Sequence, residues 1–161
     1  MTDAPAPPDA AAHLATVQID VAATPDEVFD VLDDADAYAR WVVGTRRVRD
    51  VDASWPAVGA RFHHAVGNRA AELHDWSRVC ERDRPHRLVL EVRFRPTGIA
   101  LVTIEVAPTP SGARIVLGES PTSGPAAWLP ALATGPALWV RNWVSLQRLR
   151  HEIERRAERS G

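Results

Sequence analysis

The C-terminal part of the chain constrains the fold most, because it predicts one long amphipathic helix with a polar residue inside its apolar face. Between Pro136 and Arg156 large apolar residues recur at helical spacing, and at about 100° per residue they share one side of the helix. These residues are Leu138, Trp139, Trp143, Leu146, Leu149 and Ile153. Asn142 falls near the centre of this face. A buried amide needs hydrogen-bond partners, so we expect Asn142 to face polar backbone groups or a cavity.

The sequence before this helix has the pattern of antiparallel strands. Val17, Ile19 and Val21 alternate with polar residues, which is typical of a half-buried strand. Short connections, among them the turn signal Pro110-Ser111-Gly112, favour antiparallel neighbours. The seven predicted strands are Ala15–Ala22, Thr45–Asp52, Ala60–Gly67, Glu72–Glu81, Arg87–Arg95, Ile99–Pro108 and Ala113–Ser120.

Two short helices are expected between the first two strands. Thr24 is placed to cap the first helix, Pro25 takes the first helical position, and Glu27 completes a capping box. The second helix follows Asp36 and ends at Trp41. Helices of this length are not stable alone, so we expect both to pack on the sheet.

Composition narrows the class of protein. A chain of 161 residues fits one domain, which we place at 14–158, after a flexible tail at 1–13 that is rich in Pro and Ala. All 19 basic residues are arginine and the net charge is −2, which argues against Schiff-base lysine chemistry and against a nucleic-acid partner. The N-terminus has no apolar stretch like that of a signal peptide, and no apolar run approaches the ~20 residues of a membrane span. We therefore expect a cytoplasmic protein without a membrane span.

Alternation along the strands assigns the inward-facing side chains. The side chains predicted to point inward are Phe62, His64, Val66, Leu88, Leu90, Val92, Phe94, Val102, Ile104, Val106, Ile115, Leu117 and Glu119. Strand 72–81 is ambiguous, because Trp76 and Cys80 share one face while Leu73 and Val79 share the other. We expect Trp76 to face inward.

The order of elements, together with five sequence segments, resembles the START-like, or SRPBCC, superfamily and its polyketide cyclase/dehydrase-like branch. The segments are VQIDVAATPDEVFDVLDDADAYARWV, WPAVGARFHH, CERDRPHRLVLEVR, GARIVLGESPTSGP and LWVRNWVSLQRLRHEIE. The resemblance implies an α+β helix-grip fold, in which a seven-stranded antiparallel sheet curves around the long C-terminal helix. It also implies a deep cavity between sheet and helix, but it supplies no universal catalytic residue.

Face assignment and the implied fold together predict a ligand site. The candidate ligand-binding residues are Phe62, His64, Trp76, Leu90, Phe94, Ile104, Leu117, Trp139, Asn142 and Trp143. An aromatic-lined cavity with a few polar groups suits a hydrophobic ligand, although the same side chains could fill a packed core.

His64 and Glu119 are the candidate catalytic residues, as acid or base. The structural alternatives are a satisfied core histidine and a carboxylate paired with an arginine such as Arg141. No metal or other cofactor is expected, because His63 and His64 point to opposite faces of one strand and no ligand spacing such as CxxC is present. The single cysteine, Cys80, fits a half-buried strand position better than a nucleophile.

Three functions remain open at this point. The first is binding of a hydrophobic, polyketide- or lipid-like small molecule in the cavity. The second is a metal-free aromatase/cyclase or dehydratase, in which His64 or Glu119 moves protons near a carbonyl oriented by Asn142. The third is a protein-interaction or regulatory domain with a filled cavity. Trp128, with Leu129 and Leu132, could form a homodimer patch or a lid over the cavity.

Overall fold

A computed structural model describes residues 15–68, 71–125 and 131–160 of the chain. The predicted tail at 1–13 lies outside these residues, as do Trp128, Leu129 and the side chain of Leu132. The flexible tail and the lid or dimer patch therefore stay predictions.

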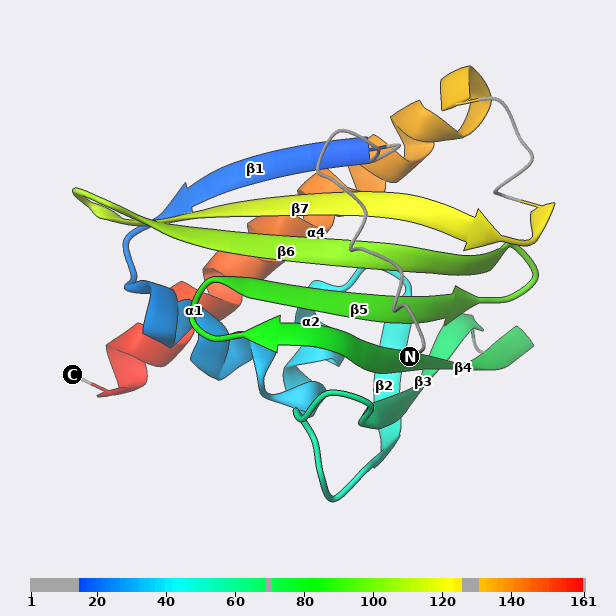
Figure 1. The fold of residues 1–161 in the computed structure, drawn as a ribbon, viewed down its shortest axis with the longest axis horizontal. Coiled ribbons are helices and arrows are strands. Elements are labelled where there is room, and N and C mark those ends of the chain that lie inside the picture. Colours follow the sequence, from blue (N-terminus) through cyan, green and yellow to red (C-terminus); the bar gives the residue numbers. More distant parts are fainter. Residues whose placement is uncertain (1–14, 69–70, 126–130, 161) are drawn as a thin grey trace, which may run out of the picture.

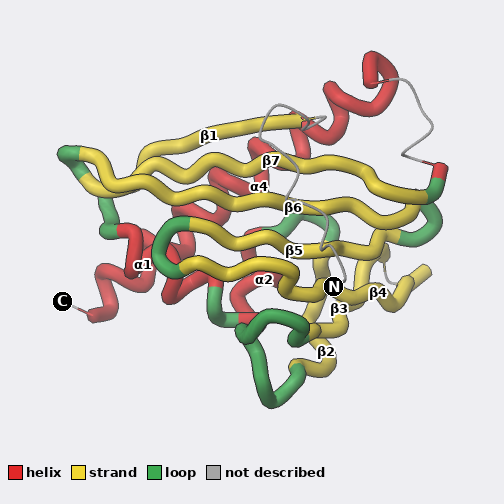
Figure 2. Tube along the Cα trace, viewed as in Figure 1, coloured by secondary structure: helices red, strands yellow, loops and turns green. Residues whose placement is uncertain are grey.

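Seven antiparallel strands form one sheet in the order β1-β7-β6-β5-β4-β3-β2, and the helices lie on one face of it (Figures 1 and 2). The strands are β1 (Ala15–Val21), β2 (Thr45–Val51), β3 (Arg61–Asn68), β4 (Ala71–Asp83), β5 (Arg87–Phe94), β6 (Gly98–Thr109) and β7 (Gly112–Ser123). The helices are α1 (Pro25–Leu32), the 3-10 turn η2 (Ala35–Ala37), α2 (Tyr38–Trp41) and α4 (Ala131–Ser160). This arrangement confirms the predicted helix-grip fold.

The capping box predicted at Thr24 is present. The Thr24 hydroxyl accepts a hydrogen bond from the Glu27 backbone N–H at 3.3 Å, and the Glu27 carboxylate accepts one from the Thr24 N–H at 2.7 Å. These bonds satisfy amides that the first turn of a helix leaves unpaired. The apolar side of α1, which includes Phe29 and Leu32, is then completely buried in the core.

The buried face of α4 is rotated relative to the prediction. Leu146, Leu149 and Ile153 are buried as expected. Trp139 and Trp143, which we predicted to face the cavity, are instead 46% and 44% exposed. The inward prediction for both tryptophans is wrong.

Polar residues on α4 explain this rotation, because their hydrogen bonds compensate for their burial. Ser145 is buried, accepts a hydrogen bond from the Val43 N–H at 3.1 Å and donates one to the Arg141 carbonyl at 2.9 Å. Glu152 is buried and accepts a hydrogen bond from Arg40 at 3.0 Å. A helical face predicted from apolar residues alone does not include Ser145 and Glu152. Because both are buried, the buried face of α4 is rotated toward them, and the two tryptophans lie on the solvent side.

Strand β4 also presents the opposite face from the one predicted. Trp76 lies opposite His63 in the β3–β4 register, on the outer face of the sheet, and the Arg61 guanidinium covers its ring at 5.0 Å. Asp75, Ser77 and Val79 are the buried residues of this strand. Trp76 is half-buried, because an arginine stacked on its indole covers part of the apolar surface, and β4 therefore places two polar residues inside and a tryptophan outside.

No helix in the described part of the chain is long and apolar enough to cross a membrane.

The packing of α4 gives a stability prediction. Leu146→Ala should lower the free energy of unfolding by about 2–5 kcal/mol, because it leaves a cavity under a fully buried side chain. Val140→Ala, on the exposed side of the same helix, should change it by less than about 0.5 kcal/mol. Urea unfolding monitored by circular dichroism measures both values. Equal losses would contradict the assigned orientation of α4.

Candidate functional site

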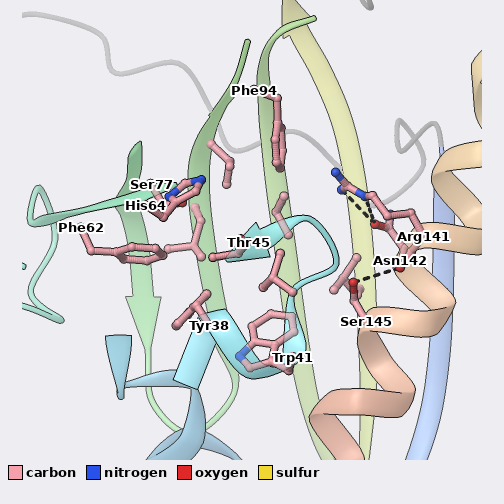
Figure 3. Close-up of a pocket in the computed structure, with 15 residues that line it drawn as sticks. Tyr38, Trp41, Thr45, Phe62, His64, Ser77, Phe94, Arg141, Asn142 and Ser145 are labelled. Carbon is pink, nitrogen blue, oxygen red and sulfur yellow. Dashed lines mark hydrogen bonds between the residues drawn. The ribbon is translucent and has the colours of Figure 1, made fainter. Parts of the chain in front are cut away.

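A cavity lies between the inner face of the sheet, α2 and α4 (Figure 3). Its volume is about 40 Å³. Its walls are mostly apolar, with aromatic rings at one end, where Tyr38 packs on Phe62 with ring centres 4.8 Å apart. The lining residues are Tyr38, Trp41, Val42, Thr45, Phe62, His64, Ser77, Leu90, Val92, Phe94, Val102, Leu117, Arg141, Asn142 and Ser145.

Six of the predicted ligand-binding residues line this cavity: Phe62, His64, Leu90, Phe94, Leu117 and Asn142. Ile104 does point inward, but it is completely buried in the core and is not part of the lining. Trp76, Trp139 and Trp143 are likewise absent from the walls, since the first is on the outer face of the sheet and the other two lie on the exposed side of α4.

The prediction missed the wall that comes from the connection between β1 and β2. Tyr38 and Trp41 on α2, together with Val42 and Thr45 just after it, close this side of the cavity. The aromatic residues at helical spacing in this segment were a usable signal. We expected the two short helices to pack on the sheet, and none of their residues was among the candidate ligand-binding residues.

Asn142 presents a donor rather than an acceptor to its surroundings. The Nε and Nη2 atoms of Arg141 both donate to the Asn142 side-chain oxygen, at 3.3 and 3.1 Å, and this fixes the orientation of the amide. The Asn142 amide nitrogen is buried and has no hydrogen-bond partner among the described residues. Its two N–H groups are therefore available.

Arg141 connects α4 to two strands beside the cavity. Its Nη2 donates to the buried Glu119 carboxylate at 2.5 Å, and its guanidinium lies 4.8 Å from the centre of the Phe94 ring. Glu119, a candidate acid or base, is thus engaged in the ion pair that we gave as its structural alternative. Glu119 itself does not line the cavity.

Trp41 supplies a second unpaired donor. Its indole nitrogen is buried and, within the described ranges, has no hydrogen-bond partner. The neighbouring Tyr38 hydroxyl differs, because it donates to the Leu32 carbonyl at 2.9 Å. Buried donors without partners are uncommon in proteins, and each costs about 1–3 kcal/mol.

His64 lies across the cavity from Asn142, next to Ser77 (Figure 3). Only 2% of its surface is exposed, and burial lowers the pKa of its imidazole to about 4, because desolvation disfavours the charged form. The ring is therefore neutral at pH 7. Its Nδ1 is buried and has no partner in the described part of the chain.

The comparisons with known proteins agree with this architecture. The family model described as polyketide cyclase / dehydrase and lipid transport matches residues 12–154. The chain belongs to this family. A search of curated proteins finds no match.

Several solved structures have a similar fold. Protein NE0264 from Nitrosomonas europaea has a TM-score of 0.70 at 16% identity, over 94% of this chain and 99% of that one. The di-domain aromatase/cyclase StfQ of the steffimycin biosynthetic pathway has a TM-score of 0.68 at 15% identity, over 89% of this chain and 51% of that one. An AHSA1-like protein from Aeromonas hydrophila has a TM-score of 0.62 at 20% identity, over 88% of this chain and 92% of that one. At these identities the similarity establishes the fold alone.

The buried histidine gives a pH prediction. Its pKa of about 4 in the folded state lies below the ~6.5 of an unfolded chain, so the unfolded state binds the extra proton first. The contribution of His64 to the free energy of unfolding is then fully present above about pH 6.5. It falls by about 3 kcal/mol as the pH drops toward 4. His64→Gln should lose most of this dependence.

The matched control is His63→Gln, on the exposed outer face of the same strand. Free energies of unfolding measured by urea denaturation at several pH values between 4 and 7 test the prediction. If His64→Gln and His63→Gln follow the wild-type curve equally, His64 is not buried in its neutral form.

Proposed function

We propose that this protein binds a small hydrophobic molecule that carries a carbonyl or similar acceptor oxygen. The observation that carries the proposal is the pair of unpaired buried donors on residues that line one cavity, the Asn142 amide and the Trp41 indole N–H. The remaining walls are mainly aliphatic and aromatic, as in sites that take apolar ligands with a few polar groups. Family membership supports the same class of function.

The cavity must widen to take such a ligand. Its 40 Å³ is close to the space of one water molecule, about 30 Å³, whereas pockets for drug-sized ligands have about 300–1,000 Å³. Five members of the lining are partly exposed, namely Val42, Thr45, Phe94, Val102 and Arg141. We therefore expect the ligand to enter past these side chains and to displace them.

Binding without chemistry has more support than catalysis. A histidine with a pKa of about 4 is a weak base at pH 7, because proton transfer is most effective when the pKa lies near the working pH. Glu119 is held by Arg141. An aromatase/cyclase or dehydratase that uses these two residues needs a ligand-induced change in both environments.

The small cavity favours a second candidate, an interaction or regulatory domain whose interior is filled by its own side chains. In that case the unpaired donors of Asn142 and Trp41 bind at most ordered water. The two candidates differ in whether a compound is retained by the purified protein.

Native mass spectrometry after incubation with a host-cell metabolite extract tests the proposal. The wild type should retain a hydrophobic compound, and Val102→Phe, which fills the partly exposed end of the cavity, should not. Leu101→Phe is the matched control, since Leu101 is the preceding residue of β6, is also half-buried and does not line the cavity. No retained compound, or equal retention by Val102→Phe, would favour the interaction domain.

Asn142→Leu separates a ligand role of this amide from a structural role. Leucine has a similar shape and removes the unpaired donor together with the oxygen that accepts from Arg141. Because these two losses oppose each other and Arg141 keeps its bond to Glu119, the free energy of unfolding of the ligand-free protein should stay within about 1 kcal/mol of wild type. Affinity for the retained compound should fall about tenfold or more, equivalent to about 1.4 kcal/mol. Chemical denaturation and titration calorimetry provide the two values. A loss of stability above about 2 kcal/mol with unchanged affinity would mean that Asn142 is a structural residue.

A further inference from the structure

Asp75 is a buried carboxylate that the proposed function does not use. Its side chain is fully shielded from solvent, although it lies on the inner face of β4 among residues that line or adjoin the cavity. One carboxylate oxygen, Oδ2, accepts a hydrogen bond from the Arg95 backbone N–H at 3.0 Å. This bond holds the carboxylate in place at the end of β5.

The second oxygen of Asp75 has no hydrogen-bond partner among the residues described. The Arg95 side chain is also near, but its Nε lies 3.9 Å from Oδ1, too far for a hydrogen bond. A buried carboxylate oxygen without a donor is costly, so this atom is available to any donor within reach.

His64 is such a donor. It lies directly opposite Asp75 in the antiparallel β3–β4 register, and both side chains are buried on the inner face. Side chains that face each other in this way have Cβ atoms about 4.5–5.5 Å apart. The unpaired atom of His64 is Nδ1. Nδ1 of His64 and Oδ1 of Asp75 are thus two buried polar atoms without partners among the described residues, on directly opposite residues of one face of the sheet.

We propose that Asp75 is a positioning residue for His64, which it holds in the tautomer with the proton on Nδ1. The lone pair on Nε2 is then left as a hydrogen-bond acceptor in the cavity wall, opposite the donor amide of Asn142. This inference deepens the proposed function and rests on it for the ligand: the bound molecule carries a hydroxyl group or another donor for His64, besides the acceptor oxygen for Asn142.

The charges around His64 are consistent with this pairing. The Asp75 carboxylate stabilises the protonated imidazole and so raises the pKa of His64, while burial and the charge of His63 lower it. Glu119 and Arg141 form their own ion pair at the α4 side of the cavity. Asp75 is thus the acidic group placed to select the tautomer of His64.

The tautomer can be measured without a ligand. Long-range ¹H–¹⁵N correlation spectra of histidine side chains distinguish a protonated ring nitrogen from an unprotonated one, and the signals of His64 are those lost in His64→Gln. At pH 7 the wild type should show Nδ1 protonated and Nε2 unprotonated. Asp75→Asn should shift the equilibrium toward Nε2–H, because the new amide can donate to Nδ1, and should move the titration of His64 to lower pH.

Asp52→Asn is the matched control. The Asp52 carboxylate also accepts a hydrogen bond from a backbone N–H, that of Arg61 at 2.9 Å, but Asp52 is exposed and is not paired with a histidine. It should leave the His64 signals unchanged. A wild-type His64 with its proton on Nε2 would overturn the proposal, as would identical His64 spectra and titrations in Asp75→Asn and Asp52→Asn.

If Asp75→Asn does not fold, the tautomer of His64 in the wild-type protein is the measurement that tests the proposal. Failure of the proposed function is seen separately, as the absence of a retained compound in the native mass spectrum. The two failures are therefore distinguishable.

Discussion

The packing of α4 on the inner face of the sheet is the contact on which the rest of the structure depends. Leu146, Leu149 and Ile153 are completely or almost completely buried in this contact, and burial of such side chains is the main favourable term in folding. The same contact sets the rotation of the helix about its axis. That rotation directs Asn142 into the interior and Trp139 and Trp143 outward, so the chemistry of the cavity follows from the packing of residues further along the helix.

The fold was predictable because it depends on local patterns that repeat many times. Alternation defines the strands, the capping box at Thr24 defines the start of α1, and helical spacing defines α4. The ends of the elements were less accurate. The helix α4 begins at Ala131 and contains Pro136, although proline is poorly tolerated in helix interiors, and we had taken that proline as the start of the helix.

The site was predictable only in part, because it depends on which side chains remain after the core is packed. His64, Phe94 and Asn142 were identified from the faces of single elements. Trp76 was placed on the wrong face, since hydrophobicity alone does not register that Asp75 can be buried through a backbone hydrogen bond or that an arginine can cover an indole. Trp41 lines the cavity because of the way the β1–β2 connection folds over the sheet. The periodicity of apolar residues in the sequence does not specify that path.

The two halves of α4 are attached to the protein in different ways. In the C-terminal half Glu152 binds Arg40, Arg155 and Arg156, and Arg156 also binds Asp34, so ionic and apolar contacts act together. In the preceding turns Trp139, Val140 and Trp143 are exposed. Local opening free energies follow the density of buried contacts; backbone amides before Arg141 should therefore exchange with solvent hydrogen faster than those near Leu149. The weaker attachment therefore lies at the end of the helix that leads into Arg141 and Asn142.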